Sequence, residues 1–212
     1  MPASFPMDDF RAFGKASAPL FPKALSDDDL NDPLERRKHS DWAWQAVRYR
    51  FRICAECNDE FKALLINPSE MWQAGWGDEE LTYKLERCIY TFFMSGLSMF
   101  ESFAYCLYFV GHTQHPGKFP DVAKPRNITL KGTTKAFAAE FPNAPITVIL
   151  TAIAAGAKFS NIDWVRNVLA HRLIGRRSIR SWTDRTKETW HIPGSPTSLT
   201  FDDDMLQRQL DD

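Results

Sequence analysis

The chain has almost no excess of charge of either sign, and this excludes one class of protein. Its 26 Lys and Arg residues against 27 Asp and Glu residues leave a formal net charge of −1, so the chain is not a globally basic nucleic-acid binder. The N-terminus also lacks the basic segment followed by an apolar segment that is typical of a secretory signal. We therefore expect a cytoplasmic protein.

Cysteine is scarce, and its placement indicates neither a disulfide framework nor a metal site. The four cysteines, Cys54, Cys57, Cys88 and Cys106, all lie in stretches with helical periodicity. The first two form a C-x-x-C, but no second pair or nearby His completes a tetrahedral set of ligands. We expect free thiols packed in a core, and we expect neither a metal nor a cofactor.

One apolar stretch, Cys88 to Val110, has the length of a membrane span. Because Glu101 and several serines interrupt it and no positive anchor beyond Arg87 flanks it, a buried core helix is favoured over a membrane span. We expect no membrane partner.

The sequence predicts one helical domain over residues 32–175 between two appendages. Residues 1–31, with four prolines and no helical or strand period, predict a partly disordered arm. Residues 176–212 predict a β-hairpin, with strands at 178–182 and 188–192, and a short helix.

Within the domain, apolar residues recur at helical spacing. The sequence also predicts a cap or a kink over Ser160 to Asp163 before the last helix, and a helix end at Gly175. The other elements expected, in order, are a helix over 33–66, a helix that begins at Asp78 and extends through Val110, a loop over 111–125, a helix around 134–140, and an apolar helix that begins at Pro145.

The final helix of the domain, which follows residues 160–163 and ends at Gly175, carries the segment Arg166-Asn167-Val168-Leu169-Ala170-His171-Arg172. We expect this segment to form the functional site. Asp163, Asn167 and His171 follow one another at four-residue spacing and share one face. Arg166 lies about 140° around the helix from His171. Its long side chain must therefore reach sideways, or it meets His171 of a second copy across a two-fold interface.

The pattern R-N-x-x-x-H near the end of the last core helix of an all-α protein resembles the HEPN domain superfamily, over residues 33 to 175. The resemblance implies a four- or five-helix bundle, often homodimeric, and a metal-independent endoribonuclease whose Arg and His line a cleft between subunits. Arg166 and His171 then match the catalytic pair, and Asn167 matches the polar residue that follows the Arg.

The chemistry is consistent with those residue types. RNA cleavage without a metal needs proton transfer at the 2′-OH and the leaving oxygen, and it needs stabilisation of a developing anion. His171, with an ordinary pKa of about 6.5, suits the proton transfer, and Arg166 suits bidentate phosphate contact. Asn167 can orient the imidazole or the substrate. In the alternative interpretation, Arg166 pairs with Asp163 and His171 caps the helix, without catalysis.

Two further groups of residues are candidates. Glu101, a carboxylate within an apolar helix, needs a partner, which is either Arg166 or His171, or else a Tyr, a Ser or a backbone group. Arg172, Arg176 and Arg177 follow the motif and can contact RNA phosphates, although such a run is also typical of a solvated surface.

The sequence thus predicts a cytoplasmic homodimeric HEPN-type ribonuclease, a toxin or defence effector that an antitoxin or another regulatory protein controls. The alternative is a noncatalytic HEPN-like module that binds a nucleotide or a protein.

Overall fold

The structure, a computed structural model, describes residues 11–12, 33–65, 79–120, 127–171, 176–181, 186–191, 199–201 and 206. The described residues are mostly helical, so the expectation of an all-α protein is confirmed at that level. The predicted arm over 1–31 and the short helix near the C-terminus lie almost wholly outside the described residues.

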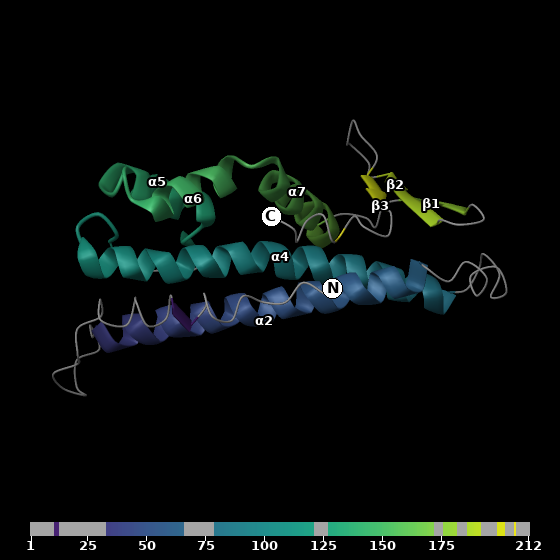
Figure 1. Cartoon of the computed structure of the whole chain (residues 1–212), viewed down its shortest axis with the longest axis horizontal. Coiled ribbons are helices and arrows are strands. Elements are labelled where there is room, and N and C mark those ends of the chain that lie inside the picture. Colours follow the sequence, from purple (N-terminus) through teal and green to yellow (C-terminus); the bar gives the residue numbers. More distant parts are fainter. Residues whose placement is uncertain are drawn as a thin grey trace. The chain divides into compact units, whose positions relative to one another are not determined.

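Five helices and three short strands make up the described elements (Figure 1). The helices are α2 (Pro33–Leu65), α4 (Glu79–Gln114), α5 (Leu130–Glu140), α6 (Pro145–Ala155) and α7 (Ala157–His171), and the strands are β1 (Arg176–Ser181), β2 (Thr186–His191) and β3 (Leu199–Phe201).

Two of the predicted helix boundaries are wrong. Helix α4 includes residues 111–114, which were expected in a loop, and the backbone N–H of His115 still bonds to the carbonyl of Gly111 at 2.9 Å. Helix α5 begins at Leu130 rather than near residue 134, because Thr129 caps it by accepting a hydrogen bond from the backbone N–H of Gly132 at 3.2 Å.

The break before the last helix also lies elsewhere than the cap or kink expected over residues 160–163. Helices α6 and α7 are separated at Gly156, whose backbone is extended (φ −68°, ψ 140°), and Ser160 to Asp163 lie inside α7. The poor helix propensity of glycine therefore decides the break, and the capping residues at 160–163 do not.

The chain divides into two compact units. The first contains Arg52–Gly96 and Asn161–Asp212, and the second contains Phe5–Phe51 and Leu97–Ser160. Helices α2 and α4 each contribute one segment to both units.

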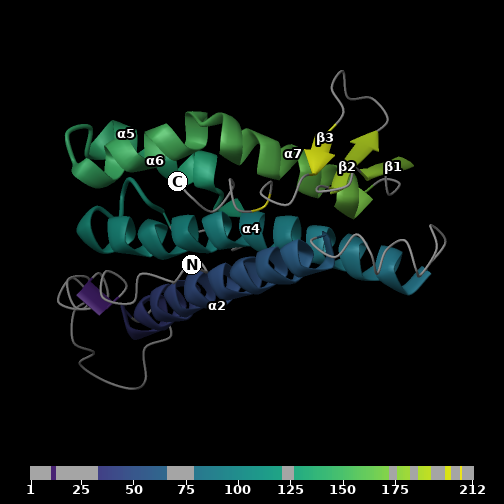
Figure 2. The same ribbon diagram turned by 45° about the vertical axis from the view of Figure 1, so that its right-hand side comes forward.

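In the second unit, α2 and α4 run antiparallel (Figure 2). The hydroxyl of Ser40 lies 3.5 Å from the carbonyl of Cys106. Further along α2, the guanidinium of Arg50 donates to the carbonyl of Ser98 at 3.2 Å and to the hydroxyl of Ser102. Residues further along α2 therefore contact residues earlier in α4, as expected for antiparallel helices.

Aromatic rings fill the space beneath the turn that follows α4. The ring of Phe119 is fully buried and lies 5.1 Å from the ring of Phe137, edge to face. A methyl group on Gly111 would lie 2.6 Å from this ring. Glycine at this position therefore permits Phe119 to close against α4.

We predict that Gly111→Ala lowers the free energy of unfolding by about 1–3 kcal/mol, because the added methyl group overpacks the site of Phe119. The control is Gly96→Ala, also within α4, where the added methyl group would lie 3.7 Å from Ile162, an ordinary contact. That variant should be neutral or gain up to about 1 kcal/mol from helix propensity. Urea denaturation followed by circular dichroism measures both, and equal stabilities would contradict the packing described.

In the first unit, α2 and α4 also pair antiparallel. The thiol of Cys54 lies 3.5 Å from the carbonyl of Phe92, and toward the end of α2, Glu60 forms an ion pair with Arg87. The large, deeply buried side chains that α2 and α4 contribute to this unit are Phe61, Leu85, Ile89, Phe92 and Phe93. These residues form its core.

All four cysteines are buried and free, as the sequence predicts. Burial raises the pKa of the Cys54 and Cys88 thiols to about 12 and that of the Cys57 and Cys106 thiols to about 11. Since an exposed thiol ionises near pH 8.5, the native thiols stay protonated at neutral pH.

We predict that the native protein reacts slowly with a thiol-specific disulfide reagent at pH 8, whereas all four thiols react after unfolding in guanidinium. The raised pKa values also imply that stability falls as the pH rises above about 9, because the unfolded thiols ionise before the folded ones. Rapid reaction of one native thiol would contradict the burial described.

The three strands pair antiparallel in the order β1-β2-β3. Arg176 lies opposite His191, and Glu188 lies opposite Phe201 in the second pairing. The first two strands begin two residues before the positions expected from the sequence.

Helix α4 is long and apolar enough to cross a membrane by length and composition alone. The core helices of soluble proteins pass the same test. A third of its most apolar window is buried inside the structure.

Candidate functional site

Helix α7 presents an apolar side to the first unit and carries the predicted motif on the remainder of its surface. Ile162, Val165, Val168 and Leu169 are buried, and Ile162 lies beside Gly96 of α4. Asp163 and Arg166 are half-buried, and Asn167 is exposed. The apolar contacts fix the rotation of α7 about its axis and so determine where the motif is displayed.

Asn167 joins two charged side chains in a chain of hydrogen bonds. Its amide nitrogen donates to Asp163 Oδ1 at 3.0 Å, one helical turn earlier. Its amide oxygen accepts from Arg166 Nη1 at 2.9 Å. Turning the amide over would set an oxygen against the carboxylate and an NH₂ group against the guanidinium, so the two partners together fix its orientation.

Among the described residues, one polar atom of the Arg166 guanidinium has no partner. Its Nε is buried and makes no hydrogen bond among the described residues. An unsatisfied buried donor costs about 1–3 kcal/mol. An acceptor bound at this position would recover that free energy, and an anionic oxygen is the acceptor that guanidinium groups bind best.

The direct ion pair between Arg166 and Asp163, which the noncatalytic interpretation expects, does not form. Within the described part of the chain, the only connection between the two side chains runs through Asn167. Asp163 thus orients Asn167 and does not neutralise the guanidinium directly.

The second half of the predicted pair cannot be described at the same depth. His171 is the last residue of α7, and its side chain lies outside the described residues, as does Arg172. The predicted convergence of Arg166 and His171 stays a prediction.

The two other arginines proposed for RNA contact lie next to each other in strand β1. Arg176 pairs in register with His191, and Arg177 pairs with Trp190. Because successive residues of a strand belong to opposite faces of the sheet, the two positions cannot serve one face together.

Glu101 has a backbone partner. Its Oε2 accepts a hydrogen bond from the backbone N–H of Leu130, the first residue of α5, at 3.1 Å. A carboxylate at this position satisfies one of the free N–H groups at the start of the helix and complements its dipole. This is the backbone alternative that the sequence left open, whereas pairing of Glu101 with Arg166 or His171 stays untested.

We predict that Glu101→Ala lowers the free energy of unfolding by about 1 kcal/mol, because α5 loses an N-terminal acceptor. Glu101→Gln keeps an acceptor oxygen and should lose less. Urea denaturation measures both. A loss of activity in Glu101→Gln at unchanged stability would instead assign Glu101 to the site.

Sequence reasoning missed the part that Asn167 plays between Arg166 and Asp163. It paired Asn167 with His171 by helical spacing, whereas the amide also reaches its immediate neighbour Arg166. The residue types already indicated this role, since the amide of Asn167 has an NH₂ group that can donate to the Asp163 carboxylate and an oxygen that can accept from the Arg166 guanidinium.

Among the residues that the structure describes, no group of three His, Cys, Asp or Glu side chains is arranged to hold a metal ion. Comparison of the chain with models of protein families, with curated proteins and with solved structures gives no match. The geometry of α7 therefore carries the functional argument.

Proposed function

We propose that the protein is a metal-independent endoribonuclease of HEPN type that uses Arg166 and His171. The observation that carries the proposal is the guanidinium of Arg166, which Asn167 holds and whose buried Nε has no acceptor within the described part of the chain. It lies five residues before a histidine at the end of the same helix. A guanidinium held in one orientation with a free donor is well placed to bind a phosphate oxygen.

The proposed reaction is attack of an RNA 2′-oxygen on the adjacent phosphorus, with a new P–O2′ bond and cleavage of the P–O5′ bond. His171 takes part in the proton transfer, either removing the proton of the 2′-OH or supplying one to the departing 5′-oxygen. Arg166 stabilises the additional negative charge on the phosphoryl oxygens. The products are a 2′,3′-cyclic phosphate and a 5′-hydroxyl.

Each supporting residue has a definite task in this proposal. Asp163 orients the amide of Asn167, and Asn167 holds one edge of the Arg166 guanidinium through its Nη1. We propose that the Nε and the other amino group of Arg166 bind the substrate. Since a guanidinium held in one orientation loses less entropy when it binds phosphate, the chain of hydrogen bonds favours catalysis.

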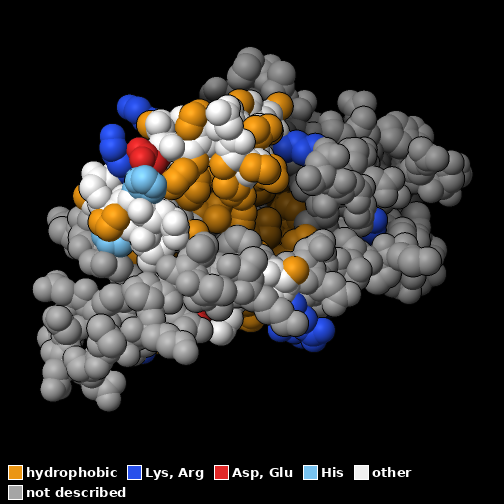
Figure 3. Space-filling view, turned by 60° about the vertical axis from the view of Figure 1, so that its left-hand side comes forward, with side chains coloured by type: hydrophobic (Ala, Val, Ile, Leu, Met, Phe, Trp, Pro, Cys, Tyr) orange, Lys and Arg blue, Asp and Glu red, His pale blue; other side chains and the backbone are white. Residues whose placement is uncertain are grey.

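The proposal includes a cytoplasmic homodimer in which each copy completes the other's cleft. It is supported by exposed apolar side chains in the second unit, since Val148 and Ile149 of α6 are 63% and 51% exposed and α6 carries no charged residue. Figure 3 shows hydrophobic side chains gathered on one face of the molecule. Surfaces of this kind are typical of protein contacts.

A toxin or defence effector of this kind must be restrained in its own cell, so we further propose that an antitoxin or another regulatory protein binds it. Arg172, Arg176 and Arg177 are the additional candidates for contact with RNA phosphates.

We predict that the purified protein cleaves mixed-sequence single-stranded RNA in EDTA. His171→Ala should lose about 10²- to 10⁴-fold in rate, and Arg166→Ala about 10²- to 10³-fold. Matched controls are His115→Ala and Arg52→Ala, whose side chains are 48% and 77% exposed in other parts of the structure. Both controls should cleave at the unaltered rate.

Equal cleavage by the unaltered protein and His171→Ala would contradict the proposal, and so would no cleavage by the unaltered protein across substrates. The second result would favour the noncatalytic HEPN-like module that binds a nucleotide or a protein.

A further inference from the structure

Helix α2 displays a stripe of exposed side chains that the proposed catalytic residues do not include. Lys38, Trp42, Gln45 and Tyr49 are all exposed and follow one another at spacings of four, three and four residues, so they lie on one side of the helix. We call these four residues the α2 stripe. It lies wholly within the second unit.

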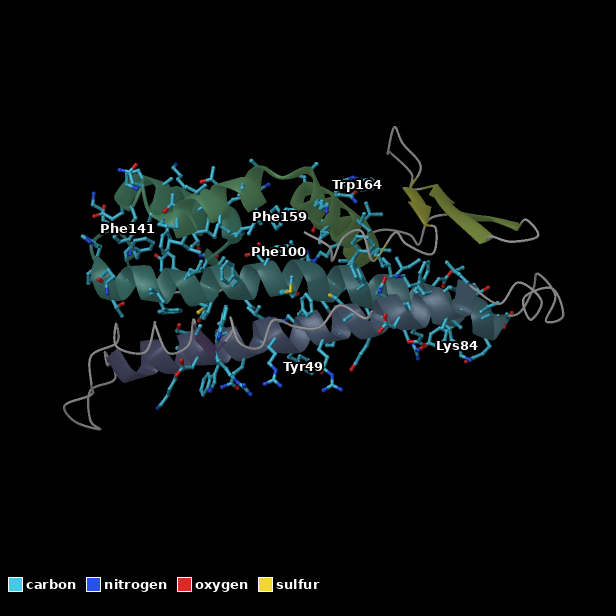
Figure 4. The ribbon with its side chains drawn as sticks, in the orientation of Figure 1. Tyr49, Lys84, Phe100, Phe141, Phe159 and Trp164 are labelled. Atoms are coloured by element: carbon cyan, nitrogen blue, oxygen red, sulfur yellow. The ribbon has the colours of Figure 1, made fainter. Side chains whose placement is uncertain are left out.

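Two large aromatic side chains on this stripe face solvent. Trp42 is 60% exposed, and Tyr49 is 67% exposed. Figure 4 shows Tyr49 extending outward from α2. They are seven residues apart, which places them about 10.5 Å apart along the helix axis. Exposed aromatic rings at this separation can each hold a different planar ligand.

The ring of Trp42 is held on one side by a neighbour. His39 lies edge to face with it at 5.9 Å between ring centroids, and the ring of His39 itself stacks on Phe109 at 5.7 Å. His39 Nδ1 lies 3.2 Å from the hydroxyl of Tyr105. Because His39 is itself held in place, its contact restricts the motion of the Trp42 ring, and a restricted ring loses less side-chain entropy when it binds a planar partner.

The stripe lies in the most basic part of α2. From Arg36 to Phe51, the sequence has five basic residues, Arg36, Arg37, Lys38, Arg48 and Arg50, against one acidic residue, Asp41. The whole chain, by contrast, has a formal net charge of −1. Arg48, exposed beside Tyr49, has no hydrogen-bond or ion-pair partner within the described part of the structure. The charge therefore favours an anionic partner.

We infer that the α2 stripe binds single-stranded RNA, with bases stacked on Trp42 and Tyr49 and a phosphate contacted by Arg48. Aromatic rings interleaved with basic side chains are the usual platform for unpaired nucleic acid, whose bases expose their flat faces. A base-paired duplex hides those faces. The inference rests on the proposed function in taking RNA as the polyanion.

A second copy of the chain suits the stripe less well. The spacing of four, three and four residues is that of a coiled-coil seam. However, Lys38 and Gln45 occupy alternate positions of that seam. A seam of this kind in water requires apolar residues at those positions, which makes RNA the better match.

The test measures binding separately from cleavage. Every protein carries His171→Ala and is kept in EDTA, and fluorescence anisotropy of a labelled mixed-sequence single-stranded RNA reports the affinity. Substitution of both rings, Trp42→Ala with Tyr49→Ala, should weaken binding at least tenfold. Substitution by Phe at both positions keeps the stacking and should restore most of the affinity. Arg48→Ala should lower the salt dependence by about one phosphate contact.

Helix α4 supplies a matched control. Tyr83 and Tyr90 are also seven residues apart and 58% and 45% exposed, but residues 79–90 contain three acidic residues against two basic ones. Tyr83→Ala with Tyr90→Ala should leave RNA affinity unchanged. Duplex RNA of the same sequence should bind more weakly than the single strand.

Three results would overturn the inference. The first is an unchanged RNA affinity after both stripe rings are removed, and the second is an equal loss of RNA affinity in the α4 control. The third is a change in oligomeric state, measured by sedimentation, when the stripe rings are removed without any loss of RNA binding. The last would identify the stripe as a contact between copies. Cleavage assays of the unaltered protein distinguish this failure from that of the proposed function. Stripe-dependent binding without cleavage leaves the inference standing, and cleavage with stripe-independent affinity overturns the inference alone.

Discussion

Helix α4 is apolar around most of its circumference, and a helix of this kind is stable in water only where other elements cover it. In the first unit, α2 covers it through the contact of Cys54 with Phe92, and α7 covers it where Ile162 meets Gly96. In the second unit, α5 is held against it by the hydrogen bond from the Leu130 N–H to Glu101. The placement of the motif follows from this constraint, because the buried side of α7 fixes which residues it displays.

Much of the helical framework was predictable because it depends on local patterns. Pro33 begins α2 and Pro145 begins α6, where the sequence places them. The errors in helix boundaries occur where the residue types favour a loop but the backbone hydrogen bonds continue the helix. Gly111 is typical of the start of a loop, yet it lies within α4, where the ring of Phe119 leaves no room for a side chain. Although Gly111 and Phe119 are only eight residues apart, hydrophobic periodicity does not report a contact between a ring and the backbone of a glycine.

The positions of the candidate residues along α7 could be predicted from helical spacing, but the hydrogen bonds between them could not. Helical spacing places Asp163 and Asn167 on one face, and they do bond to each other. The same spacing separates Arg166 from that face, and it says nothing about a side-chain bond between neighbours such as Arg166 and Asn167. The partner of Glu101 was equally beyond reach, because Leu130 lies 29 residues further along the chain. Pairing over such a distance is decided by packing of the whole unit.

We propose that Arg166 and His171 cleave RNA through its own 2′-oxygen, and the chemical ends of the fragments test this mechanism. Mass spectrometry of RNA treated with the protein in EDTA should find 2′,3′-cyclic phosphate and 5′-hydroxyl ends, while a 2′-deoxy strand of the same sequence stays intact. Fragments with 5′-phosphate ends, or equal cutting of the deoxy strand, would contradict the account, because neither reaction uses the 2′-oxygen.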